Sequence, residues 1–444
     1  MNRFFKCLSL ALIIFSVNGG AQVKKLPATP AKKTVFIKNP RTEKEWIKAQ
    51  IDSLTCFKMH GRGYVYNGKD EAAKYIVKQF KEYKLKGLNK DGTYTQGFSF
   101  PVNTFPGKQI LTVNDTKLKA GEEYLIDPAS PSWTGENMEV QKINLGKIKD
   151  STAWKETLAE FDQTHVWYLE NSEALCTKLK IRLDKLVRLL PKGCFVIPEQ
   201  NKLTWSLSRD TMPATVYYVK EDHLPKKLKS VTGEVREVLL DKCSSYNIAG
   251  IIPGEVKDTF IAITSHYDHL GMMGDSATFA GASDNASGVA MMLSLANYFS
   301  KHPQHYSLLF VAFAGEEAGL LGAEFFTWHP LVPLKSIKFL TSIGVMSDVS
   351  NGITVVNSTD YPIELEKMQQ VNTKNSYIKE IRSKGQAANS NHYYFSNFGV
   401  PSFFVYSNGG KEHYHDVFDA PELINLSNVG AATRLLMDFI KVLN

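Results

Sequence analysis

Apolar segments alternate with helical segments from Asn247 onward, and this alternation constrains the fold more than any other feature of the 444-residue chain. Strands are expected at 259–265, 306–314, 337–346 and 402–406, and helices at 286–299, 318–326 and 428–443. Strands that alternate with helices form a mostly parallel sheet with helices on both faces. We therefore predict an α/β fold with a mostly parallel, mixed sheet flanked by helices.

The chain before this region changes character once. Residues 41–105 carry two helical patterns, and we assign them to the amino-terminal part of the same domain. Residues 106–235 carry short β-like stretches and one helical stretch, without a cluster of metal-binding or nucleophilic residues. The β-like stretches are 194–198, 203–207 and 214–219. We predict that 106–235 form an inserted, smaller, β-rich accessory domain, and that 236–444 form the domain that carries the chemistry.

The first 21 residues have the pattern of a signal peptide. Arg3 and Lys6 precede an apolar run at 7–17, and small residues at 19–21 end the segment. The apolar run is too short to span a bilayer comfortably. We predict export to the periplasm or the extracellular space, a flexible lead-in at 22–40 and no permanent membrane anchor. Retention of the segment as an anchor is the alternative.

Charge and cysteine usage argue against two other kinds of site. The net charge of +7 is partly carried by scattered lysines, without an arginine-rich stripe and interleaved aromatics, so no nucleic-acid partner is expected. The four cysteines outside the signal peptide form no CxxC pair, which argues against a cysteine-bound zinc ion. In an exported chain they form disulfides or remain free thiols.

Four short motifs follow the expected strands or open the expected helices. In the first motif, His266 and Asp268 are two residues apart, so they point the same way in an extended chain. His266 could then bind a metal through one ring nitrogen while Asp268 accepts a hydrogen bond from the other. A surface histidine beside an acid is the alternative for this motif alone.

The other motifs add carboxylates and a second histidine. Asp284 opens a helix, where aspartate also serves as an N-cap. Glu316 and Glu317 follow a very apolar strand, where adjacent carboxylates are costly to bury unless a cation offsets their charge. A solvated helix start is the alternative for this pair. His415 could complete a metal site, and the hydroxyl of Tyr414 could polarise a carbonyl; ordinary packing is the alternative for both.

The four motifs are expected to converge, because ligand sites in open α/β sheets lie at the carboxyl ends of strands. Histidine and carboxylate ligands beside a free glutamate are the residue types of a catalytic zinc site. In their order and spacing the motifs resemble those of the M28 metallopeptidase family, which includes bacterial aminopeptidases. The resemblance covers nearly the whole chain after the signal peptide. It implies a zinc exopeptidase-like fold, a catalytic peptidase domain at 236–444 and a PA-like insert.

The resemblance also implies a role for each matching residue. The metal ligands are His266 at a first metal, Asp284 as a bridge, and Glu317 and His415 at a second metal. The catalytic residues are Glu316 as general base, Asp268 as the acid behind His266, and Tyr414 as a contact to the substrate carbonyl.

One expected ligand is missing. The family has an aspartate at the end of the next strand, where this chain has Gly344. The first metal then keeps only His266 and Asp284, whereas the second keeps three protein ligands. Candidates for a substitute ligand are Asp348, His269, His392 and His413. We therefore predict one tightly bound zinc ion and a second ion that is weak or absent.

Two functions are compatible with these residues. The first is a secreted, zinc-dependent exopeptidase of the aminopeptidase type, in which a metal-activated water attacks a peptide substrate with Glu316 as general base. The second is a catalytically impaired relative that binds peptides or amino acids, which the glycine at position 344 suggests.

Overall fold

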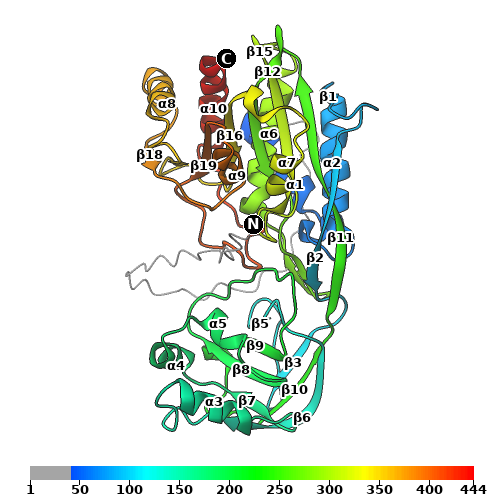
Figure 1. The fold of residues 1–444 in the computed structure, drawn as a ribbon, viewed down its shortest axis with the longest axis vertical. Coiled ribbons are helices and arrows are strands. Elements are labelled where there is room, and N and C mark those ends of the chain that lie inside the picture. Colours follow the sequence, from blue (N-terminus) through cyan, green and yellow to red (C-terminus); the bar gives the residue numbers. More distant parts are fainter. Residues whose placement is uncertain (1–41) are drawn as a thin grey trace, which may run out of the picture.

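The computed structural model describes residues 42–444, so the predicted signal peptide and lead-in lie outside the described residues. The chain forms a nine-stranded sheet with flanking helices and a separate eight-stranded sheet, which occupy the upper and lower parts of Figure 1. In the part of the chain that the structure describes, no helix is long and apolar enough to cross a membrane. The four cysteines of this part are free thiols.

Four parallel strands form the centre of the nine-stranded sheet, in the order β15, β12, β16 and β19. They span Tyr306–Phe313, Val256–His266, Ile337–Ile343 and Ser402–Ser407. Almost every side chain of β15 is buried, as expected for a strand that is covered on both faces. Outer strands extend the sheet: β1 (Lys86–Gly87), β2 (Thr95–Thr104) and β11 (Val238–Ile252) on one side, β17 (Ile353–Val356) and β18 (Ile381–Lys384) on the other.

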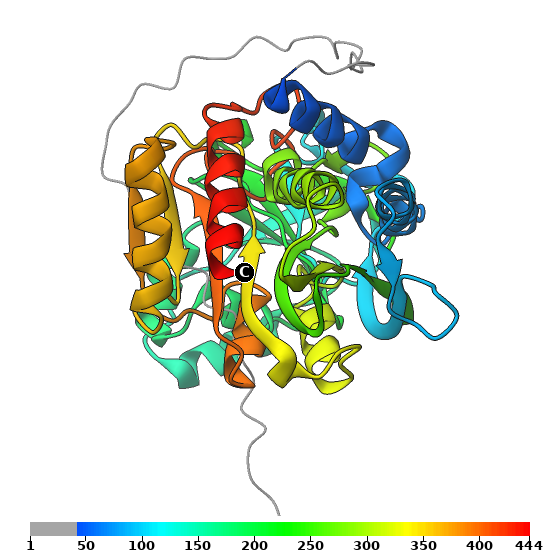
Figure 2. The ribbon, with the colours of Figure 1, turned by 90° about the horizontal axis from the view of Figure 1, so that it is seen from above.

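Helices cover both faces of this sheet, which confirms the predicted α/β class. One core joins one face of the sheet to α1 (Glu43–Thr55), α2 (Gly68–Glu82), α6 (Gly288–Phe299), α8 (Pro362–Asn375) and α10 (Val429–Leu443). A second core joins the opposite face to α7 (Leu321–Trp328) and α9 (His392–Asn397). Figure 2 shows α10 and α6 on one side of the sheet and α7 on the other.

Local signals explain how some of these helices begin. At α1, the Thr42 side chain accepts from the Glu45 backbone while the Glu45 side chain accepts from the Thr42 backbone, which forms a capping box. The helix expected from 318 begins only at Leu321, so that prediction is wrong at its start. The chain turns first, because the amides of Gly319 and Leu320 both donate to the Glu316 carbonyl.

The eight-stranded sheet lies within residues 110–235 and has its own helices and core clusters. Its strands are β3 (Ile110–Val113), β4 (Thr116–Lys117), β5 (Tyr124–Ile126), β6 (Trp133–Lys142), β7 (Val166–Tyr168), β8 (Gly193–Glu199), β9 (Ala214–Lys220) and β10 (Ser230–Val235). Its helices are α3 (Ser151–Glu160), α4 (Ser172–Leu179) and α5 (Leu183–Val187). One of its clusters also contains Leu270 and Phe279, so the sheet packs against the loops that follow β12.

One stretch of this unit does not form the expected strand. Residues 203–207 belong to no strand, which contradicts the β-like pattern of the sequence. Instead of pairing within the sheet, the segment crosses to the loop after β19, where the Trp205 amide donates to the His415 carbonyl. The Trp205 amide, which would pair with a neighbouring strand, is therefore bonded to a loop of the nine-stranded unit.

Candidate metal centre

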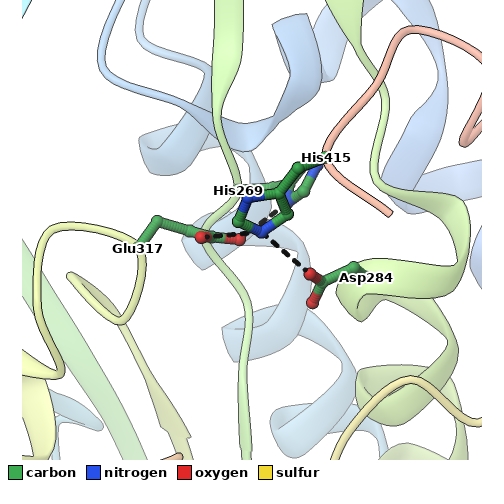
Figure 3. Close-up of side chains that lie close together, drawn as sticks. All are labelled: His269, Asp284, Glu317 and His415. Carbon is green, nitrogen blue, oxygen red and sulfur yellow. Dashed lines mark hydrogen bonds and ion pairs between the residues drawn. The ribbon is translucent and has the colours of Figure 1, made fainter. Parts of the chain in front are cut away.

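The central parallel strands place the expected site residues at one edge of the sheet. β12 ends at His266, and Glu316 and Glu317 lie in the turn that follows β15. Asp284 lies in the turn before α6, and His415 lies in the loop after β19. Figure 3 shows Asp284, Glu317 and His415 pointing toward one another from three separate segments. The structure thus brings together side chains that are up to 149 positions apart in the sequence, from His266 to His415.

His415, Asp284 and Glu317 converge on a common point. The Nε2 atom of His415 lies 3.2 Å from Asp284 Oδ2 and 3.3 Å from Glu317 Oε2. Nε2 is nevertheless buried without a hydrogen bond of good geometry. Buried polar atoms rarely remain unsatisfied. A nitrogen and two carboxylate oxygens that converge in this way fit a divalent metal with nitrogen and oxygen ligands, such as zinc.

His269 is the additional histidine that the structure brings to this point. Its Nδ1 lies 2.8 Å from Glu317 Oε1, whereas His415 Nε2 faces the other carboxylate oxygen, Oε2; Figure 3 shows both rings beside Glu317. The ligand atoms of His269, Asp284, Glu317 and His415 all lie within 4.8 Å of one another. His269 therefore either joins the metal ligands or fixes the orientation of Glu317, as outer hydrogen-bond partners of metal ligands do.

The other three candidates for a substitute ligand have other contacts. The Asp348 carboxylate accepts from the Ser350 amide and from the Asn425 side chain. His392 stacks on the ring of Phe404, with ring centroids 5.7 Å apart, and His413 lies 3.4 Å from the Asp416 carboxylate. Among residues 42–444, none of these three belongs to a group of side chains that could hold a metal.

The half of the site around His266 lacks a carboxylate at Gly344. His266 Nε2 lies 3.3 Å from Asp284 Oδ1 and 3.9 Å from Glu316 Oε2. β12 pairs Thr264 with Ser342, so the chain two residues further along each strand brings His266 beside Gly344. A Cβ atom on Gly344 would lie only 2.9 Å from Cε2 of Phe404. An aromatic ring therefore lies against the place where a ligand side chain would begin.

Burial and nearby charges set the proton affinity of the central carboxylates. Burial raises the pKa of Glu316, and the charges of Glu317 and Asp284 raise it further against the opposing charge of His266. Burial would also raise the pKa of Glu317, but the charge of His415 and the hydrogen bonds with His269 and His415 together lower that pKa to about 2. Two adjacent glutamates thus differ in their affinity for a proton, which is the pattern of a base beside a ligand.

The two histidines that face these carboxylates also have raised pKa values. Burial lowers the pKa of His415, but Glu317 and Asp284 outweigh this effect and hold it well above 6.5. The same balance raises the pKa of His266 to about 10, chiefly through Glu316 and Asp284. Carboxylate charge therefore dominates the site, and a bound cation would relieve it.

Asp268 holds the two glutamates rather than His266. The closest approach of its carboxylate to His266 Nδ1 is 3.9 Å, and that nitrogen instead lies 3.2 Å from the Asp268 carbonyl. The carboxylate accepts from the amides of Glu316 and Glu317 at 3.2 and 3.3 Å, and from the Tyr64 hydroxyl at 2.7 Å. The sequence predicts His266 as the partner of this carboxylate, whereas its observed partners are two backbone amides and Tyr64. The chain turns after β15 and brings two backbone amides to the Asp268 carboxylate, so these amides, and not His266, donate to it.

Tyr414 lies flat on the metal-ligand candidate next to it. Its ring stacks on the ring of His415, with centroids 3.9 Å apart and an interplanar angle of 13°. The side chain is 46% exposed, so one side of it faces solvent. This position borders the site from outside.

Two buried residues support the site without a predicted role. Arg62, whose side chain is fully buried, donates to the carbonyls of Tyr267, Ala280 and Gly281 at 2.7–2.8 Å. Burial lowers the pKa of its guanidinium to about 10, against the nearby carboxylates that raise it. Asp419 accepts from the amide of Asp284 at 2.9 Å. The sequence contains the signal for neither role, because both contacts join segments far apart in the chain.

Comparisons with known proteins relate this chain to one family of peptidases. The model of "Peptidase family M28" matches residues 247–440. Aminopeptidase YwaD of Bacillus subtilis is 28% identical over 225 residues, which cover 48% of this chain and 46% of that protein. The aligned region thus spans less than half the length of this relative.

Solved structures extend the similarity to both sheets. An aminopeptidase from Aneurinibacillus sp. strain AM-1 has a TM-score of 0.62 at 18% identity, over 90% of this chain and 93% of that one. BSAP, a zinc aminopeptidase from Bacillus subtilis, has a TM-score of 0.64 at 17% identity, over 89% of this chain and 94% of that one. At these identities the similarity concerns the fold.

Proposed function

Residues 247–440 belong to peptidase family M28, and we propose that the chain is a zinc-dependent exopeptidase that hydrolyses amino-terminal peptide bonds. The observation that carries the proposal is the convergence of Asp284, Glu317 and His415 beside a third, separately held carboxylate, Glu316. Three protein ligands with a remaining open position are the composition of catalytic zinc sites, whereas structural sites use four.

We assign the metal ligands to Asp284, Glu317 and His415, and we give His269 the role of orienting Glu317. The 2.8 Å contact to Oε1 leaves Oε2 directed at the point where His415 Nε2 lies. When bound, zinc supplies Lewis acidity at the scissile carbonyl and lowers the pKa of the attacking water. We propose one zinc ion per chain, since the His266 half has no carboxylate at position 344.

Glu316 is our candidate for the general base. Its side chain is only 14% exposed, is not one of the three proposed ligands, and has a raised pKa, which brings its proton affinity closer to the working pH. The backbone amide of Glu316 donates to the Asp268 carboxylate, which restrains the position of the Glu316 backbone. Glu316 takes a proton from the attacking water and donates it to the leaving amine.

The aminopeptidase assignment draws on the similar proteins named aminopeptidases, and the predicted signal peptide supports export. The second candidate remains a peptide-binding protein without turnover, favoured by Gly344 and by Phe404 against it. A direct measurement of hydrolysis distinguishes the two candidate functions.

Metal removal provides that measurement. We expect the purified chain to bind about one zinc ion and to hydrolyse aminoacyl chromogenic substrates, and we expect chelation to abolish hydrolysis and added zinc to restore it. N-acetylated versions of the same substrates should resist hydrolysis if the enzyme requires a free amino terminus. Elemental analysis of the protein gives the zinc content in parallel with the rate.

Two outcomes would contradict parts of the proposal. Hydrolysis that survives complete zinc removal would exclude a metal-dependent mechanism. A zinc-loaded protein that binds dipeptides but hydrolyses none of a broad panel would replace the peptidase with the peptide-binding protein.

A histidine substitution tests the orienting role of His269. We expect His269→Ala to weaken zinc binding by about 10–100-fold, because Glu317 would lose the hydrogen bond that fixes it. Competition with a chromophoric chelator measures the dissociation constant. His302→Ala is a matched control, because His302 contacts the Tyr298 carbonyl on the surface, away from the site. An unchanged affinity of the His269 variant would remove His269 from the metal centre.

A further inference from the structure

The segment 202–205, which we name the strap, leaves the eight-stranded unit and touches the loop that carries His415. The Trp205 amide donates to the His415 carbonyl at 3.0 Å. On the same residue, the Trp205 carbonyl lies 3.1 Å from His415 Nδ1. A carbonyl can only accept, so Nδ1 carries the hydrogen. Nε2, which faces Asp284 and Glu317, is then the nitrogen that is free to bind a metal.

The side chain of Lys202 reinforces this contact. Its Nζ lies 2.8 Å from the Glu412 carbonyl, 2.6 Å from the Tyr414 carbonyl and 3.0 Å from the buried Asp416 carboxylate. An ammonium group has three hydrogens. All three can be used on residues 412–416, so a single lysine of the second unit holds the chain on both sides of His415.

Trp205 anchors the strap at its other end. The side chain is only 3% exposed, its indole nitrogen donates to the Ile126 carbonyl at 2.8 Å, and its ring stacks on Phe279 with centroids 4.7 Å apart. Ile126 ends β5 of the eight-stranded sheet, whereas Phe279 ends β14 (Ala277–Phe279) in the loops after β12. The side chain of Trp205 therefore fixes the strap to both units, while the backbone of the same residue contacts His415.

The backbone of His415 explains why such a restraint is needed. Its φ angle is +60°, in the left-handed region that residues other than glycine seldom adopt. Such conformations persist where the surrounding contacts determine them. The contacts from Trp205 and Lys202 lie on the carbonyl of His415 itself and on the residues at either side of it.

We propose that the strap is part of the metal centre: Lys202 and Trp205 are positioning residues that hold His415 in the conformation and tautomer that bind the metal. The eight-stranded unit then does more than cover the site, because one of its loops completes the site. This inference deepens the proposed function and rests on it where metal affinity is concerned. Its mechanical part, the restraint of residues 412–416, stands on the contacts alone.

The substitution Lys202→Met tests the proposal in the full chain. It removes the donated hydrogen bonds and keeps the length of the side chain. We expect the zinc dissociation constant to rise by about 10–100-fold, as for the loss of other outer partners of metal ligands. We also expect faster hydrogen–deuterium exchange at residues 412–416. Lys202→Arg, which keeps a cation with several donors, should recover most of the affinity, whereas simple loss of packing would not be rescued.

Lys155→Met, on the exposed side of α3 in the same unit, is the matched control and should change neither measurement. Wild-type affinity and wild-type exchange in Lys202→Met would overturn the proposal. If the wild-type chain binds no zinc, the proposed function fails, and exchange alone decides: faster exchange in Lys202→Met supports the restraint, and equal exchange overturns it. A lowered melting temperature without either change would also overturn it, since that result describes a merely structural lysine.

Discussion

Replacement of Glu316 by glutamine is expected to lower kcat on aminoacyl substrates by about 10²–10⁴-fold while the zinc content stays at one ion per chain. The amide keeps the size of the side chain and removes its capacity to accept a proton. Metal binding should persist, because the proposed ligands Asp284, Glu317 and His415 are unchanged and Glu316 does not belong to the group of side chains around His415. Steady-state rates and elemental analysis of the same preparation test both parts.

The control for this variant is Glu156→Gln on the exposed side of α3, which should behave as the wild type. A Glu316→Gln protein that loses zinc together with activity would make Glu316 a ligand rather than a base. A variant that keeps wild-type activity would remove Glu316 from the mechanism.

Most strands of the central sheet could be predicted because each is marked by residues within and next to it in the sequence. The strands at 259–265, 306–314 and 402–406 are apolar runs bounded by turn residues, and all three lie within the observed β12, β15 and β19 or extend one residue beyond them. The same reasoning failed at 203–207, where the residues have a strand pattern but form no strand. That segment is held by contacts to a loop some 210 positions later, such as that between Trp205 and His415, and no local pattern records such a contact.

The candidate site divides in the same way. The strand order and the motifs place His266, Asp284, Glu317 and His415 at one edge, because carboxyl ends of parallel strands meet there. The sequence could not show that His269, one of the four candidate ligands for the first metal, instead lies at Glu317 of the second, since that depends on how the loop after β12 folds. Nor could it reveal that the Asp268 carboxylate binds the amides after β15, because that requires the exact turn of the chain.

A carboxylate restored at position 344 is expected to create a second zinc site, but only if the ring of Phe404 is also removed. Gly344→Asp alone is expected to keep one zinc per chain and to lower the melting temperature. The new Cβ would lie 2.9 Å from Cε2 of Phe404, a contact that is too close unless the ring moves. That ring is buried and stacked on His392, so it has little freedom to move away.

The double variant Gly344→Asp/Phe404→Leu removes that obstacle. We expect it to bind two zinc ions, because an aspartate beside His266 would join Asp284 in a three-ligand set. Elemental analysis after dialysis against a low zinc concentration gives the stoichiometry, and Phe404→Leu alone should remain at one ion. Two zinc ions in Gly344→Asp alone would contradict the expected obstacle and show that the ring of Phe404 moves aside for the new side chain. One ion in the double variant would mean that His266 is no longer held as a ligand, so that loss of the carboxylate was followed by loss of the whole first site.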